Sequence, residues 1–190
     1  MKFHLKYLAY GLIAFTALGA GVYFGMGTYA PAPAPAQTTR LFEQIFPNSQ
    51  GQPQALAQWR GKILVVNFWA PWCPPCVEEM PELATWQHQM QGRNVQLIGI
   101  GVDSAANISA FMAKNKNIDY PLLVAGAAGI ELSQQLGNPQ GGLPYTVVID
   151  AQGRVKYQKS GRIALPELTQ LAQSLLAESA TEASDAPGKP

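Results

Sequence analysis

Cys73 and Cys76 are the residues whose type and spacing point most directly to chemistry, and the chain contains no other cysteine. Residues at i and i+3 lie on the same face of a helix. A cysteine at a helix N-terminus also meets unpaired N–H groups and the positive end of the helix dipole, which lower its pKa. The spacing therefore predicts a redox-active dithiol, with Cys73 as the thiolate nucleophile and Cys76 as the more buried, resolving thiol.

Other uses of this pair are disfavoured. A zinc site needs four ligands, and the chain has only two cysteines and two histidines, so we expect no metal. A purely structural disulfide usually closes a longer loop. We expect no cofactor besides the redox-active Cys73–Cys76 disulfide. The net charge of +1 gives no indication of a nucleic-acid partner.

Two further residues could take part in the chemistry. Glu79 follows Cys76 by three residues, so its carboxylate is expected on the same helix face. Burial there would raise its pKa and allow proton exchange with Cys76, whereas the alternative is a solvated glutamate, as expected of Glu78. Pro144 directly precedes an expected strand, and base rates for X–Pro bonds favour a trans peptide.

Alternating strands and helices must position these residues. Apolar, β-branched runs predict strands at 63–69, 95–102 and 122–124. Helical spacing predicts helices at 77–90, 108–114, 130–136 and from 165 to about 175. A hairpin is expected from 145–150 and 154–159. The order predicts an α/β fold with a mixed central sheet flanked by helices on both faces.

The N-terminal segment has the properties of a membrane anchor. The run from Tyr7 to Ala30 contains no charged side chain, and as a helix it would span about 36 Å, more than the hydrocarbon core of about 30 Å. Lys2 and Lys6 precede it and the next charge is Arg40, which predicts a cytoplasmic N-terminus and an exported domain. A cleavable signal sequence is the alternative.

Composition divides the chain into four parts. Residues 1–30 are expected to form the anchor and residues 31–40 a Pro/Ala-rich linker, in which the alternating Pro-Ala run 31–36 favours an extended polyproline spacer. Residues 41–177 are expected to form one folded domain. The Ala/Ser/Glu-rich tail 178–190 has little apolar surface to bury and is expected to be disordered.

The stretch VVNFWAPWCPPCVEEMP, residues 65–81, resembles the active-site strand and helix of the thioredoxin-like superfamily. The similarity is to its membrane-tethered, exported branch, typified by TlpA, ResA and CcmG, and covers about residues 41–177. It implies a thioredoxin-like fold in which Cys73 attacks, Cys76 resolves and Glu79 tunes the pair. It also implies a cis-proline facing the dithiol, which Leu143–Pro144 matches against the base rate.

The sequence departs from the superfamily pattern at two positions. Asn67 stands where thioredoxin has a buried acid, so the resemblance leaves proton handling to Glu79. Tyr145 stands where a small residue is common after the cis-proline, which implies an altered docking groove. The residues expected to line that groove for a protein substrate are Trp72, Pro74, Pro75, Leu143 and Tyr145.

The resemblance implies an exported thiol–disulfide oxidoreductase in the bacterial inner membrane, single-pass, with its catalytic domain on the periplasmic side. Reduction of protein disulfides is the favoured direction, with cytochrome c maturation as the leading context and a membrane electron donor of the DsbD or CcdA type. An oxidant that donates disulfides to exported proteins uses the same chemistry in reverse. A non-redox chaperone or metal-delivery module is the alternative from another class.

Overall fold

The computed structural model describes residues 36–185. The expected anchor at 1–30 and the first part of the expected spacer therefore lie outside the described residues, as does the end of the tail, 186–190. Within 36–185, no helix combines the length and apolar character needed to cross a membrane.

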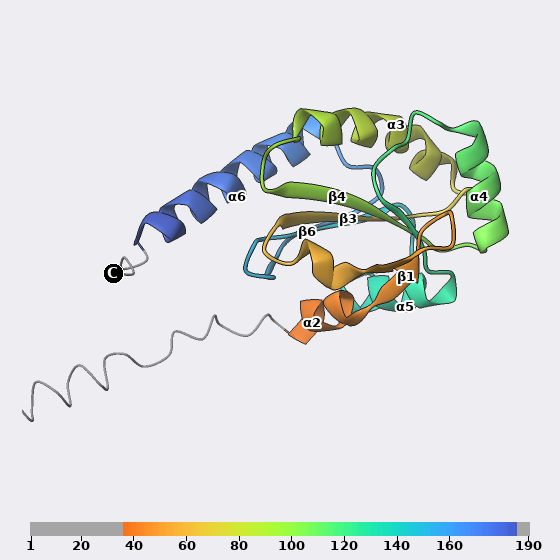
Figure 1. The fold of residues 1–190 in the computed structure, drawn as a ribbon, viewed down its shortest axis with the longest axis horizontal. Coiled ribbons are helices and arrows are strands. Elements are labelled where there is room, and N and C mark those ends of the chain that lie inside the picture. Colours follow the sequence, from red (N-terminus) through yellow and green to blue (C-terminus); the bar gives the residue numbers. More distant parts are fainter. Residues whose placement is uncertain (1–35, 186–190) are drawn as a thin grey trace, which may run out of the picture. The chain divides into compact units, whose positions relative to one another are not determined.

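A five-stranded mixed sheet forms the centre of the domain, in the order β5-β4-β3-β6-β7. Figure 1 shows its three inner strands, β4, β3 and β6. The pairs β3–β4 and β4–β5 are parallel, whereas β6 is antiparallel to both β3 and β7. The strand bounds are β3 Ile63–Trp69, β4 Val95–Gly101, β5 Leu122–Val124, β6 Tyr145–Ile149 and β7 Val155–Ser160. The predicted mixed sheet is confirmed, with strand ends within one residue of expectation.

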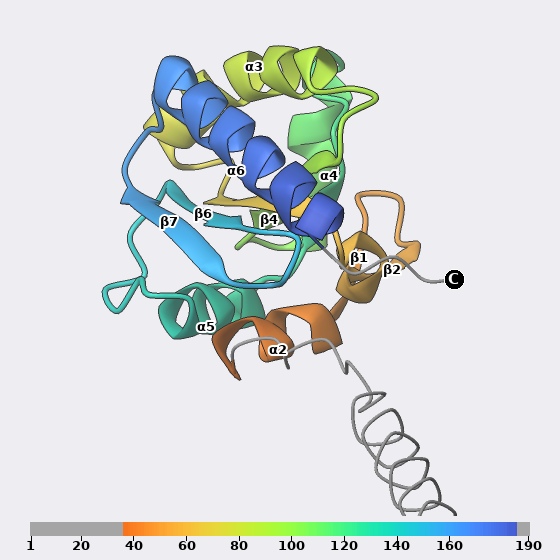
Figure 2. The ribbon, with the colours of Figure 1, turned by 90° about the vertical axis from the view of Figure 1, so that its left-hand side faces the viewer.

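Helices cover both faces of the sheet, and Figure 2 shows α3 and α6 on one side and α2 and α5 on the other. One hydrophobic core lies under α3, α4 and α6, and a second under α2, α5 and a short 3-10 helix, η1. The helix bounds are α2 Ala36–Glu43, η1 Leu56–Trp59, α3 Pro74–Gln89, α4 Ala105–Lys114, α5 Ala127–Gln135 and α6 Leu165–Asp185. The structure thus has the predicted layers.

Strand β3 carries the chain to the dithiol and is buried along its whole length. Its side chains alternate between the two cores: Val65 and Trp69 face the core under α3, whereas Val66 and Phe68 face the core under α2 and α5. Asn67, between Val66 and Phe68, falls by the same alternation on the α3 side. A polar side chain in a central strand therefore lies beneath the helix that bears the cysteines.

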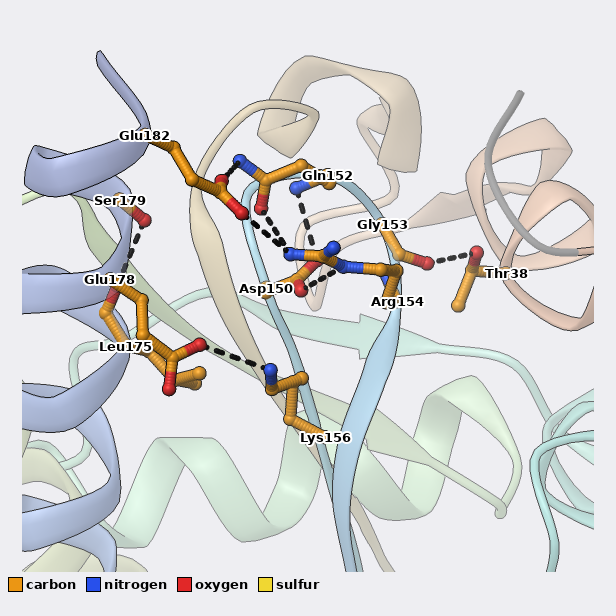
Figure 3. Close-up of polar contacts among 10 residues, drawn as sticks. All are labelled: Thr38, Asp150, Gln152, Gly153, Arg154, Lys156, Leu175, Glu178, Ser179 and Glu182. Atoms are coloured by element: carbon orange, nitrogen blue, oxygen red, sulfur yellow. Dashed lines mark hydrogen bonds and ion pairs between the residues drawn. The ribbon is translucent and has the colours of Figure 1, made fainter. Parts of the chain in front are cut away.

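Residues 36–40 were expected to belong to the linker and not to the folded domain, and this part of the prediction is wrong. Helix α2 already begins at Ala36, and the buried Thr38 hydroxyl donates a hydrogen bond to the Gly153 carbonyl (Figure 3). Leu41 and Phe42 then pack into the core under α2. The helix forms because this apolar face has a core to enter, which the composition of the segment did not reveal.

The C-terminal boundary also differs from the prediction, because α6 continues to Asp185 rather than giving way to disorder after 177. Glu178 accepts from the Lys156 ammonium at 3.0 Å, and Glu182 pairs with Arg154 at 3.3 Å (Figure 3). Both cations belong to the β7 hairpin. Alanine and glutamate favour helix, and these ion pairs between distant parts of the chain support the extension although it buries little apolar surface.

A short hairpin before β3 was not predicted. It consists of β1 Ile45–Pro47 and β2 Pro53–Ala55. The Asn48 side-chain oxygen accepts from the backbone N–H groups of Gln50 and Gln52, both at 2.9 Å, and closes the turn. Strands of three residues are too short to show an alternation of apolar and polar side chains, which is why no strand was predicted here.

Candidate active site

The two cysteines lie where β3 gives way to α3. Cys73 is the N-cap residue of α3, and its carbonyl accepts from the backbone N–H groups of Cys76 and Val77, both at 3.1 Å. The Sγ atoms of Cys73 and Cys76 are bonded at 2.01 Å, with the two Cα atoms 5.3 Å apart. The predicted position of Cys73 at the helix N-terminus is confirmed, and this position favours a thiolate once the pair is reduced.

The surroundings distinguish the two sulfurs. Cys73 is 4% exposed, whereas Cys76 is fully buried. Trp72 next to the pair is 64% exposed, which is unusual for so large an apolar side chain, and Pro74 and Pro75 are also exposed. Of the two sulfur-bearing residues, Cys73 is therefore the more accessible from outside.

Glu79 lies one turn beyond Cys76 and is only 1% exposed. Its Oε1 accepts from the Asn67 amide at 2.8 Å, and its Oε2 accepts from the Ile163 backbone N–H at 3.3 Å. Burial raises the pKa of this carboxyl above its usual value, an effect opposed in part by the Asn67 and Ile163 hydrogen bonds. The expected burial of Glu79 is confirmed, while its part in proton transfer remains a prediction.

Asn67 occupies the position of the missing strand acid and contacts Glu79 directly. Besides Glu79, its amide nitrogen donates to the Thr146 hydroxyl on β6 at 3.1 Å. An amide does not ionise, so it holds the carboxylate through hydrogen bonding without adding a second negative charge. One buried acid therefore lies beneath the dithiol, fixed from the strand below and from the loop before α6.

The Leu143–Pro144 peptide bond is cis, as the resemblance implied and against the base rate. Pro144 immediately precedes β6, whose first residue, Tyr145, pairs with Phe68 near the end of β3. The carbonyl of Pro144 accepts from the Gly161 backbone N–H at 2.8 Å. Register alone thus brings the cis-proline to the end of the sheet at which the dithiol lies.

Residues 29–174 match the sequence profile of the family described as Redoxin. The chain belongs to the Redoxin family. The thiol-disulfide oxidoreductase ResA of Geobacillus thermodenitrificans is 28% identical to this redoxin over 86% of its chain and 91% of ResA. The thiol:disulfide interchange protein HelX of Rhodobacter capsulatus is 29% identical over 63% and 64% of the two chains.

Solved structures agree with the architecture of this redoxin. A thioredoxin-family thiol:disulfide interchange protein from Chlorobium tepidum superposes with a TM-score of 0.63 at 29% identity, covering 79% of this chain and 99% of its own. A structure titled MTB dsbF, at 24% identity and a TM-score of 0.62, supports the fold alone. This redoxin therefore has the thioredoxin-like fold and is a thiol–disulfide oxidoreductase, and it contains the disulfide-bonded pair Cys73–Cys76.

The expectation that the ring of Tyr145 lines the docking groove is wrong. Tyr145 is 1% exposed and lies in the core under α2 and α5, on the opposite face of the sheet from Glu79. Its hydroxyl donates to the Leu136 carbonyl at 2.8 Å, and its ring lies 6.2 Å from that of Phe68. Alternation along β6 is the cause, because Thr146 rather than Tyr145 faces Asn67.

The structure has a hollow of about 400 Å³ beside the exposed Trp72, but apart from Trp72 its lining differs from that predicted for the groove. Phe111 and Lys114 of α4 line it together with Trp72, whereas Leu143, half-buried, lies elsewhere. The sequence pointed to α4 only as a helix, because nothing in its spacing shows which face meets the Trp72 turn.

Three buried polar atoms beneath α3 have no hydrogen-bond partner within the described part of the redoxin: Asn67 Oδ1, Trp69 Nε1 and the Tyr120 hydroxyl. An alanine-type Cβ at Gly99, beside Asn67 in the sheet, would lie 3.1 Å from the Trp69 nitrogen and 3.2 Å from the Tyr120 ring. Trp69 and Tyr120 thus approach each other over a glycine.

Across residues 36–185, no group of three His, Cys, Asp or Glu side chains is placed to hold a metal ion.

Proposed function

We propose that this redoxin is an exported, membrane-anchored reductant of protein disulfides. The observation that carries the proposal is the pair Cys73–Cys76 at the N-terminus of α3, with the outer sulfur beside an exposed tryptophan and the inner one beside a buried acid. A donor of two electrons resets the pair after each turnover.

The chemistry proceeds in two exchanges. The Cys73 thiolate attacks a client disulfide, which forms a mixed disulfide and releases one client sulfur as a thiolate. Cys76 then loses its proton to the Glu79 carboxylate and attacks Cys73, which releases the second client sulfur and leaves the Cys73–Cys76 disulfide. The raised pKa of Glu79 suits this step, because it narrows the gap to the pKa of a thiol.

The client contacts the exposed surface around Cys73. In this proposal the exposed Trp72 and Pro74, next to Cys73 in the chain, contact the client, and Leu143 and the cis-Pro144 contribute to the same docking surface. We place exported protein disulfides here as substrates, with apocytochrome c as the leading one. Their support is the likeness to ResA and HelX, together with the resemblance to the tethered branch.

Residues 1–30 supply the anchor in this proposal. The support is the charge-free run from Tyr7 to Ala30, its length and the lysines that precede it. This arrangement puts the domain on the periplasmic side of a bacterial inner membrane, where a membrane donor of the DsbD or CcdA type could reduce it.

Trapping in intact cells tests the direction of transfer. Acid quenching followed by alkylation of the full chain reports the reduced fraction of Cys73 and Cys76. A mostly reduced pair in an oxidising compartment is the expected result, whereas a mostly oxidised pair that persists with the donor present identifies an oxidant. A Cys76→Ser variant should accumulate mixed disulfides with clients, and a Cys73→Ser variant, as the matched control, should accumulate none.

A further inference from the structure

The segment Ser160–Ile163, here called the strap, crosses from the end of β7 to α6 and touches both halves of the site. The Gly161 N–H donates to the carbonyl of the cis-Pro144 at 2.8 Å. Two residues on, the Ile163 N–H donates to Glu79 Oε2 at 3.3 Å. One short backbone segment therefore links the cis-proline to the buried acid, 84 residues away from it in sequence.

Arg162 lies between these two residues of the strap, and its side chain forms ion pairs with the outer face of α3 (here called the grip). Its two terminal nitrogens pair with Glu78 Oε2 and Glu82 Oε1, both at 3.2 Å. These glutamates are i and i+4 neighbours, so one planar guanidinium spans a full turn of the helix. The turn that Arg162 spans is the one that carries Glu79.

The exposure of these groups separates positioning from stability. The Arg162 side chain is 41% exposed, and exposed ion pairs contribute little to folding. Ile163 and Glu79, in contrast, are buried. The exposed ion pairs of Arg162 therefore add little stability, but they fix the position of the buried Ile163 N–H relative to the Glu79 carboxylate.

Several groups face the Glu79 carboxyl. Burial is the largest influence and raises its pKa, and the negative charge of Glu82 acts in the same direction. The Asn67 amide, the Ile163 N–H and the charge of Arg162 lower its pKa. Tyr120 is buried as well, and the charge of Glu79 helps to raise the Tyr120 pKa. The Cys76 thiol of the reduced protein is a further titratable group on the same helix.

We propose that the strap is a positioning element of the exchange reaction: by gripping Glu78 and Glu82, Arg162 holds the Ile163 N–H on Glu79 and keeps the carboxylate oriented for Cys76. The same segment fixes the carbonyl of the cis-Pro144, so the proline and the acid move as one unit. Arg162 is a positioning residue here, because it touches neither sulfur. The inference rests on the proposed role of Glu79 as proton acceptor for Cys76.

Two ways of removing the grip give opposite results if Arg162 acts only through its charge. Arg162→Gln removes both the grip and the positive charge. The double variant Glu78→Gln/Glu82→Gln removes both ion pairs and keeps Arg162. It deletes two negative charges, of which that of Glu82 raises the Glu79 pKa. Charge alone predicts a lower Glu79 pKa in the double variant, whereas loss of the Ile163 hydrogen bond predicts a higher one.

The measurement is the pH dependence of the second exchange step in the full chain. Reduced protein is mixed with saturating oxidised glutathione, quenched by alkylation, and followed by intact-mass spectrometry from the Cys73–glutathione adduct to the internal disulfide. The rate of this step should rise with pH as Glu79 loses its proton, and in both variants this rise should occur at a higher pH. At pH values below the rise, both variants should be about tenfold slower than wild type, as expected for one lost hydrogen bond to a charged group. Adduct formation should not change.

Arg162→Lys should give an intermediate shift, because an ammonium cannot span both carboxylates in the way that a guanidinium does. Lys156→Gln, which removes an ion pair remote from the dithiol, is the matched control and should change neither step. A downward shift in the double variant, or no shift in either, overturns the strap proposal. If a Glu79→Gln variant keeps the wild-type pH dependence of this step, the role of Glu79 as proton acceptor in the proposed function is refuted instead.

Discussion

Replacing Tyr145 by phenylalanine tests whether the residue after the cis-proline belongs to the core or to the docking surface. The change keeps the ring and removes only the hydroxyl that donates to the Leu136 carbonyl at 2.8 Å. The same carbonyl accepts from the Gln158 side chain at 2.7 Å. Gly137 permits this approach, because a Cβ there would lie 2.3 Å from the Gln158 amide nitrogen.

The two donors set the expected magnitudes. With Gln158 in place, the carbonyl keeps one side-chain donor, so Tyr145→Phe should lower the free energy of unfolding by about 1 kcal/mol, the usual value for one hydrogen bond. Gln158→Ala should cost a similar amount. The double variant should exceed the sum by about 1 kcal/mol, because the Leu136 carbonyl then loses both side-chain donors.

Urea unfolding of the oxidised protein gives the three free energies, with unchanged m-values as the control for a two-state comparison. The rate of exchange with a peptide disulfide should be the same in Tyr145→Phe as in wild type, since the ring lies on the far face of the sheet. Leu143→Ala, beside the cis-proline, should slow this exchange and serves as the positive control. A Tyr145→Phe variant of unchanged stability and reduced exchange rate would contradict the core assignment.

Three further predictions concern Glu79, the tail and Trp72. Because burial raises the Glu79 pKa, the folded protein binds this proton more tightly than the unfolded chain does. The resulting stability relative to Glu79→Gln should be complete below about pH 4.5 and lost as the pH rises through the folded-state pKa. Urea titrations from about pH 4 to 8 measure this dependence, and the opposite trend would exclude it. Deleting residues 178–190 should lower the free energy of unfolding by about 1 kcal/mol through lost ion pairs with Lys156 of β7 and with Arg154 in the turn before it, whereas a disordered tail would give no change in chemical denaturation. Trp72→Ala should slow exchange with a peptide disulfide about tenfold and leave the rate with oxidised glutathione unchanged, and an equal loss with both would show that the indole acts on the sulfurs rather than on the client.

Local sequence patterns predicted much of the fold. The apolar run of β3, the helical spacing of α3 and the position of the cysteines between them all depend on neighbours within a few residues. The cis form of Pro144 came from the resemblance rather than from the residues, since base rates alone favoured trans. Element ends were harder to predict, because α2 and the end of α6 are held by contacts with the distant turn before β7 and with β7.

The sequence by itself determined that a dithiol stands at a helix N-terminus with a glutamate one turn later, because spacing within a helix fixes which side chains share a face. Only the tertiary structure decided what meets that glutamate: Asn67 from the strand below and Ile163 from a loop 84 residues away. It likewise decided the face of the sheet on which Tyr145 lies. Strand register and helix crossovers set these contacts, and both depend on burying two cores at once rather than on any local preference of the chain.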